Sequence, residues 1–164
     1  MSSYKVDFNL IQKLALICPD WSIVLIGLVG EGDPNTSINL LTNIENIYLL
    51  GPRSYKELPK LMHFCDVGLL PCVLNHYTRA MFPMKFFEYL AAGLPVVSTR
   101  LPSLEEFADY MCFADTAEEF ASKITQILSN SSHFDEQRVK KLLTKHSYRR
   151  RTEIMIKTIK QVLF

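Results

Sequence analysis

The sequence lacks the features of several protein classes. Its four cysteines include no Cys-x-x-Cys pair and its four histidines show no ligand spacing, so neither a metal site nor a disulfide framework is predicted. Its apolar runs, such as residues 23–30 and 67–74, are far too short to cross a bilayer, and no signal-peptide pattern precedes them. Scattered cysteines in apolar contexts are typical of a reducing compartment, so we expect a cytoplasmic protein.

The composition is that of a globular domain. The 164 residues are 48% hydrophobic and 21% charged. They contain no internal repeat, low-complexity segment or linker. A chain of this size and composition can bury a sizeable core, so residues 1–164 are predicted to form a single domain.

The formal net charge of +1 hides a basic C-terminal segment. Residues 135–164 carry nine lysine and arginine side chains against three carboxylates. A solvated helix face accounts for such a segment, and so does contact with an anionic lipid surface or an acidic partner domain. No aromatic stacking pattern accompanies the charges, so nucleic acid is not predicted to be a partner.

Alternating helical and strand patterns predict the fold class. Strands are predicted at residues 23–27, 47–50, 66–71, 96–97 and 111–113, and helices at residues 7–17, 37–42, 57–62, 83–92, 116–128, 135–145 and 148–162. Residues 72–82 are predicted to form a long connection. This order predicts a doubly wound α/β fold, with a mostly parallel, Rossmann-like sheet and helices on both faces.

Residues 83–99 are the most informative segment for function. Pro83 suits the first turn of a helix and Gly93 its C-terminal cap, and a buried strand follows. Lys85 and Glu88 are three residues apart, so they share a helix face. Open α/β sheets bind ligands beyond the carboxyl ends of their strands. We therefore expect Lys85 to offset phosphate charge at such a site.

Four further residues are candidate ligands of a nucleotide. Thr78 and Asn75 precede the helix and can hydrogen-bond phosphate or sugar hydroxyls, although residues of these types often serve turns. Gly51 and Arg53 follow a predicted strand, where a base edge can meet backbone groups.

Several short segments, in this order and spacing, carry a family resemblance. They are Pro19-Asp20-Trp21, Asn46-Ile47, Leu50-Gly51, Tyr55-Lys56-Glu57-Leu58-Pro59, residues 66–71, Asn75, Thr78, residues 83–99 and residues 147–151. From Asp7 to its end, the chain resembles the C-terminal, donor-binding domain of GT-B glycosyltransferases. It is most similar to the bacterial family 4 type, which is grouped with teichuronic-acid and other polysaccharide-building enzymes.

The resemblance implies an enzyme of two facing Rossmann-like halves. This half is expected to hold a nucleoside diphosphate sugar as donor substrate, without a further cofactor, and an N-terminal half that this chain does not contain is expected to hold the acceptor. In the family, the second glutamate of a Glu-x7-Glu pair hydrogen-bonds the ribose, and Glu88 occupies its position. The first glutamate falls at Ala80, which has no carboxylate.

The resemblance also implies that a first strand precedes Val6. We therefore expect this chain to be a fragment of a two-domain enzyme, with a sheet that lacks its first strand. A sheet edge left free in this way favours self-association, and we expect a homodimer.

The leading hypothesis is the donor-binding half of a glycosyltransferase that moves a hexose from a nucleoside diphosphate sugar to a glycan or lipid-linked acceptor. We expect it in the cytoplasm or peripheral to the inner face of the membrane, and inactive without the other half. The alternative is a non-catalytic binding or scaffold domain, which Ala80 favours. A nucleotide-sugar epimerase shares the architecture, but its catalytic carboxylates and histidine have no evident counterparts here.

Overall fold

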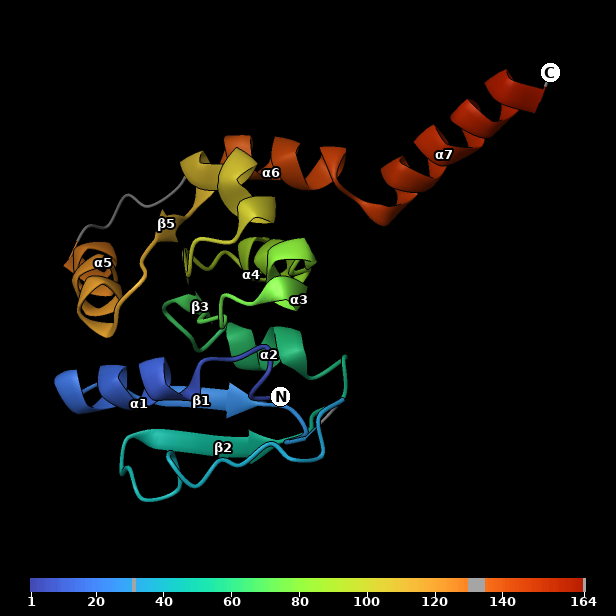
Figure 1. Ribbon diagram of the computed structural model, residues 1–164. Helices are drawn as coiled ribbons and strands as arrows, with labels where there is room; N and C mark the ends of the chain where they lie inside the picture. Colours follow the sequence, from blue (N-terminus) through green and yellow to red (C-terminus); the bar gives the residue numbers. More distant parts are fainter. Residues whose placement is uncertain (31, 130–134, 164) are drawn as a thin grey trace. The chain divides into compact units, whose positions relative to one another are not determined.

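The computed structural model describes residues 1–30, 32–129 and 135–163, and the chain forms two compact units (Figure 1). Unit 1 is Met1–Ser131 and unit 2 is Ser132–Phe164. Unit 2 contains the helices α6 (Glu136–Lys145) and α7 (Tyr148–Leu163), and the described strands all belong to unit 1.

The strands of unit 1 form two parallel sheets. β1 (Ile23–Ile26) pairs with β2 (Ile47–Gly51). β4 (Val96–Ser98) lies between β3 (Gly68–Leu70) and β5 (Cys112–Phe113) and is parallel to both. This confirms the predicted parallel α/β class, although the sheet is divided: within the described residues no strand joins β1 to β3.

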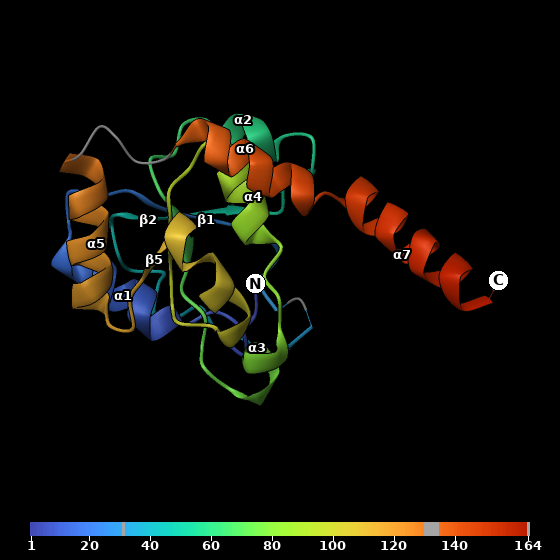
Figure 2. The same cartoon turned by 90° about the horizontal axis from the view of Figure 1, so that it is seen from above.

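Helices cover both faces of the strands. α1 (Phe8–Ile17) and α2 (Leu58–Met62) lie on opposite sides of β1 and β2 (Figure 2). α5 (Ala117–Ser129) packs beside α1, and α4 (Lys85–Ala91) packs on β3 and β4. This arrangement is the one expected for crossover connections between parallel strands.

A large apolar core lies between α1, α5 and the strands. α1 begins at Asp7, whose Oδ1 accepts a hydrogen bond of 2.9 Å from the Leu10 N–H, as the sequence predicts. At the other end of the helix, the Asn46 side-chain amide donates to three carbonyl oxygens, at 3.0 to 3.1 Å, which are those of Ala15, Cys18 and Trp21. The bonds to Ala15 and Cys18 satisfy carbonyls at the end of α1, and the bond to Trp21 holds the turn that leads into β1. The apolar core residues are Phe8, Leu10, Ile11, Leu14, Ala15, Ile23, Leu41, Ile47, Val97, Ala114, Ala117, Phe120, Ile124 and Ile127.

Three local predictions need correction. Residues 37–42 form no helix, and residues 39–42 are turns. The Asn39 N–H donates to the Ser37 hydroxyl oxygen at 3.3 Å, a local bond that competes with a helix, and Leu41 is buried in the core from the turn. The predicted connection at residues 72–82 contains a short helix, α3 (His76–Ala80).

The third correction is η1 (Pro102–Tyr110), a 3₁₀ segment that the sequence did not predict. It is kinked at Phe107, whose φ of −106° and ψ of 16° are not helical, and its buried residues Leu104 and Phe107 are three positions apart.

The N-terminal segment, residues 1–7, connects the ends of both sheets. The Gly30 N–H, after β1, donates to the Met1 carbonyl at 2.8 Å. After β3, Val6 forms an antiparallel bridge with Cys72, and the Val73 N–H donates to the Lys5 carbonyl at 3.0 Å. Residues 1–7 therefore join the segment after β1 to the segment after β3. We call the segments that follow β1 to β5 the carboxyl rim: residues 27–30, 52–54, 71–75, 99–101 and 114–116.

α7 of unit 2 is amphipathic. Its exposed apolar side chains Tyr148, Met155, Ile159 and Val162 fall on one stripe of the helix. None of the helices in the described parts of the chain has the length and apolar character needed to span a membrane.

Candidate nucleotide site at the carboxyl rim

Buried polar side chains gather at the carboxyl rim. Within the described residues the buried polar side chains are Ser2, Thr78, Ser98 and Thr99, and each lies on or beside the rim. The Thr99 hydroxyl accepts from the Cys72 N–H at 3.0 Å. The Thr78 hydroxyl donates to the Val73 carbonyl and the Ser98 hydroxyl to the Thr99 carbonyl, so these side chains hold the backbone of the rim in one geometry before any ligand arrives.

The aromatic face of α4 decides where its charged residues point. Phe86 is fully buried and Phe87 nearly so, and their rings pack against Phe107 at centroid distances of 5.1 and 5.5 Å. Lys85 and Glu88 lie on the other side of the helix, with Lys85 exposed and Glu88 half-buried. The predicted shared face of these two residues is thus directed away from the core.

The Lys85 charge acts on the Cys72 thiol of the rim, and the Glu88 charge acts on the phenol of its neighbour Tyr89. Burial raises the pKa of the Cys72 thiol to about 11, against the opposing effects of the Thr99 hydrogen bond and the nearby Lys85 charge. Burial also raises the pKa of the Tyr89 phenol to about 12, and the Glu88 charge adds to this rise. Within the described residues, neither the Lys85 ammonium group nor the Glu88 carboxylate forms a hydrogen bond or an ion pair. Both charges are therefore available to a ligand.

Asn75 and Thr78 form a capping box at the start of α3. The Thr78 N–H donates to Asn75 Oδ1 at 2.9 Å, and the Asn75 N–H donates to the Thr78 hydroxyl oxygen at 3.0 Å. The Thr78 hydroxyl is buried and donates to the Val73 carbonyl, while the Asn75 amide donates to the Tyr4 carbonyl at 2.6 Å. Both side chains therefore hold the rim together, and their contact with a donor stays a prediction.

Gly51 and Arg53 lie at the end of the other sheet. Gly51 has a φ of +68°, which a glycine adopts without strain. Its carbonyl accepts from the Gly27 N–H at 3.0 Å, which ties the ends of β2 and β1 together. Arg53 is exposed beside Ser54, whose hydroxyl donates to Glu57 at 2.6 Å. The six predicted ligands thus fall into two groups, one at the end of each sheet.

The rim also contains a cation that sequence reasoning missed. The Arg100 guanidinium lies 4.8 Å from the centroid of the Phe113 ring, and the Arg100 N–H donates to Asp115 at 3.3 Å. Arg100 comes two residues after the buried strand β4. A cation at this position, just beyond the carboxyl end of a strand, is the sequence signal by which it could have been found. Across the described ranges of the chain, no cluster of three or more His, Cys, Asp or Glu side chains is placed to hold a metal ion.

Comparison with known proteins decides the family. The family model described as "Glycosyl transferases group 1" matches residues 5–130, which include both sheets and the carboxyl rim. The chain belongs to the group 1 glycosyltransferases.

A curated relative of this group 1 chain is TuaH of Bacillus subtilis, which is named as a teichuronic acid biosynthesis glycosyltransferase. The two are 42% identical over 100 residues, which cover 60% of this chain and 25% of TuaH.

The solved structures that resemble the chain are GT-B glycosyltransferases. One of them is HepE of Anabaena, solved in complex with UDP and glucose. The match covers 88% of this chain and 45% of the HepE chain, with a TM-score of 0.62 and 21% identity. The GtfA/B complex matches 99% of this chain and 34% of the other, with a TM-score of 0.67 and 16% identity. The chain therefore has the GT-B fold of one half and spans less than half the length of these proteins.

The capping box generates a stability prediction. Thr78→Val removes a buried hydroxyl that has two partners, and we expect it to lower the free energy of unfolding by about 1–3 kcal/mol. Asn75→Ala removes the helix cap and the bond to Tyr4, with an expected loss of about 1–2 kcal/mol. Urea unfolding measures both changes. His76→Ala, at an exposed neighbour, is the control and should change stability by about 0.5 kcal/mol or less. Equal stability of all three variants would contradict the structural role assigned to the box.

Proposed function

We propose that this chain is the donor-binding half of a glycosyltransferase that moves a hexose from a nucleoside diphosphate sugar to a glycan or lipid-linked acceptor. The observation that carries the proposal is the pair formed by Lys85 and Glu88. Both lie on the side of α4 that faces away from the core, both are without hydrogen-bond or ion-pair partners within the described residues, and Lys85 lies near Cys72 on the rim.

The chemistry of the two side chains suits two parts of one donor. An ammonium group offsets the charge of a diphosphate, and this matters most as the nucleoside diphosphate departs and gains negative charge. A carboxylate accepts hydrogen bonds from a pair of ribose hydroxyls, as the family resemblance implies for Glu88. Backbone groups at Gly51 to Arg53 are then free to meet the base edge. The donor enters as a substrate, and the proposal needs no resident cofactor.

Relatives support the nucleotide part of this proposal. HepE was solved with UDP and glucose and also with UDP-glucose. The TuaH name supports a product in cell-surface polysaccharide synthesis. At 21% identity, HepE supports UDP as the first nucleotide to try, and the sugar and acceptor remain open to experiment.

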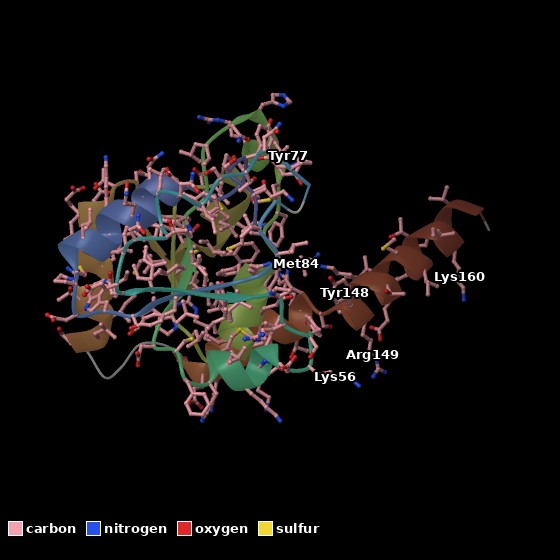
Figure 3. The ribbon with its side chains drawn as sticks, turned by 90° about the horizontal axis from the view of Figure 1, so that it is seen from below. Lys56, Tyr77, Met84, Tyr148, Arg149 and Lys160 are labelled. Atoms are coloured by element: carbon pink, nitrogen blue, oxygen red, sulfur yellow. The ribbon has the colours of Figure 1, made fainter. Side chains whose placement is uncertain are left out.

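We further infer that the apolar stripe of α7 packs against the other half of a two-domain enzyme. The match to the GtfA/B structure covers 99% of this chain, α7 included, yet only 34% of that protein. The stripe exposes 63% of Met155 and 78% of Val162, which is unusual for a helix with no partner. Arg149 and Lys160 project from the same side of α7 (Figure 3). Peripheral contact with an anionic membrane is the competing explanation for this surface.

The four free cysteines support a cytoplasmic location for the whole enzyme. A non-catalytic scaffold is the alternative function, since Ala80 lies on α3 where the family has its first glutamate. A transfer assay on the two-domain enzyme separates these two functions.

Nucleotide binding tests the roles of Lys85 and Glu88 directly. In calorimetric titrations of this chain, we expect Lys85→Ala and Glu88→Ala each to weaken UDP binding about tenfold or more, the loss typical of a charged hydrogen bond. Titration with uridine separates the roles, because Glu88→Ala should weaken uridine binding and Lys85→Ala should leave it unchanged. Lys60→Ala, in the last turn of α2, and Glu45→Ala, before β2, are the matched controls. UDP affinities that are equal in all four variants would reject the assigned roles.

Association of the isolated chain tests the α7 surface. We expect light scattering to show concentration-dependent association in the wild type, because the uncovered stripe buries itself against a second copy. Ile159→Asp places a charge on the stripe and should shift the chain to monomer, whereas Gln161→Asp adds the same charge on the polar face and should not. A strict monomer in the wild type, or equal association of both variants, contradicts the stripe as a docking surface. Pelleting of the wild type with anionic vesicles, lost in Ile159→Asp alone, would instead favour the membrane.

A further inference from the structure

An exposed aromatic pair lies where the N-terminal segment meets α3. The ring centroids of Tyr4 and Tyr77 are 5.7 Å apart, with an angle of 55° between the ring planes. About half of each residue is exposed, 51% for Tyr4 and 45% for Tyr77. Tyrosine offers a large, stiff contact area at a low cost in conformational entropy, which is why it is frequent at binding surfaces.

The pair is mounted on backbone that other contacts hold in place. The Asn75 side chain donates to the Tyr4 carbonyl at 2.6 Å, across 71 positions of the sequence. The Val6–Cys72 bridge and the bond from the Val73 N–H to the Lys5 carbonyl fix the same two segments. Little ordering is therefore needed when a ligand arrives, and this lowers the free-energy cost of binding.

Cations lie on the Tyr77 side of the pair, whereas on the Tyr4 side the Asp33 carboxylate accepts from the Ser3 hydroxyl at 3.0 Å. Lys5 Nζ lies 5.4 Å from the centroid of the Tyr77 ring, within the range of a cation–π interaction. Arg79 is exposed on the same short helix as Tyr77. The sequence has no aspartate or glutamate between Asp66 and Glu88. A ligand that combines a ring face with a negative group fits the Tyr77 side of this surface.

The position of the pair relative to α4 suggests which ring it meets. Figure 3 shows Met84, just before Lys85, between Tyr77 on one side and Lys56, from the loop after β2, on the other. Figure 2, seen along the same axis from the other side, also has α4 between α3 and α2, whereas α3 lies between α4 and α2 in Figure 1. In the proposed function the base lies toward the loop after β2 and the diphosphate lies at Lys85. Along this line of sight Tyr77 therefore lies on the opposite side of Met84 from the loop after β2, which is the side left for the sugars of the reaction.

We propose that Tyr4, Tyr77 and Lys5 form a stacking subsite for a sugar ring beside the diphosphate, an inference that rests on the proposed function. The C–H face of a pyranose packs on an aromatic ring because the ring face is electron-rich. Lys5 and Arg79 attract a phosphate or carboxylate that the sugar carries. The ring belongs either to the donor hexose or to an anionic acceptor glycan, and the chemistry of recognition is the same for both.

The test compares three probes in calorimetric titrations of this chain: UDP, UDP-glucose and a hyaluronan tetrasaccharide. Tyr77→Leu should leave UDP affinity unchanged. If the donor hexose stacks on the pair, Tyr77→Leu should lower the affinity for UDP-glucose by about three- to tenfold. If an acceptor stacks there, the same variant should lower the affinity for the tetrasaccharide by a similar factor. Tyr77→Phe keeps the ring and should behave as the wild type. Tyr55→Leu, at another exposed tyrosine, is the matched control.

Each remaining outcome counts against the subsite. It is overturned if Tyr77→Leu changes neither sugar-bearing probe, if Tyr55→Leu changes one of them equally, or if the wild type binds UDP-glucose no better than UDP and does not bind the tetrasaccharide. Failure of UDP itself to bind the wild type would contradict the proposed function as well. UDP binding with no effect of Tyr77→Leu on either sugar-bearing probe would contradict the subsite alone.

Discussion

The structure depends on the hydrogen bonds that residues 1–7 make with the ends of both sheets. β1 and β3 share no backbone bond in the described chain, yet Met1 accepts from Gly30 after β1, and Lys5 accepts from Val73 after β3. These bonds bring the carboxyl ends of two separate sheets to one rim. A ligand site that draws on both sheets exists only while this connection holds.

The same rim explains why so many polar groups are buried on one side of an otherwise apolar domain. Thr78, Ser98 and Thr99 satisfy backbone groups there and fix the loops, so they position the site without needing to touch a ligand. The binding groups proper are those left without partners among the described residues. Lys85 and Glu88 owe that state to Phe86 and Phe87, which bury the opposite side of α4 and prevent the helix from rotating.

Helices and strands with a regular spacing of apolar residues were predictable from the sequence, because that spacing reflects which side chains are buried. The cap at Asp7, the buried run that starts at Ile23 and the helix at Lys85 follow their patterns. Turns were harder. Leu41 looks helical in sequence but is buried from a turn, and Asn75 and Thr78 form a capping box of a short helix where the sequence predicts an open connection. The contact of Tyr4 with Tyr77 was beyond prediction, since only tertiary structure joins residues so far apart in sequence.

Chemical-shift mapping with UDP on the isotopically labelled chain tests the central claim most directly, because it reports where the nucleotide binds and not only whether it binds. The account predicts that the largest amide shifts fall on the rim and the start of α4, at Gly51, Arg53, Lys85 and Glu88. Largest shifts at the amino ends of the strands, near Ile23, Ile47 or Val96, or along α7, would contradict it.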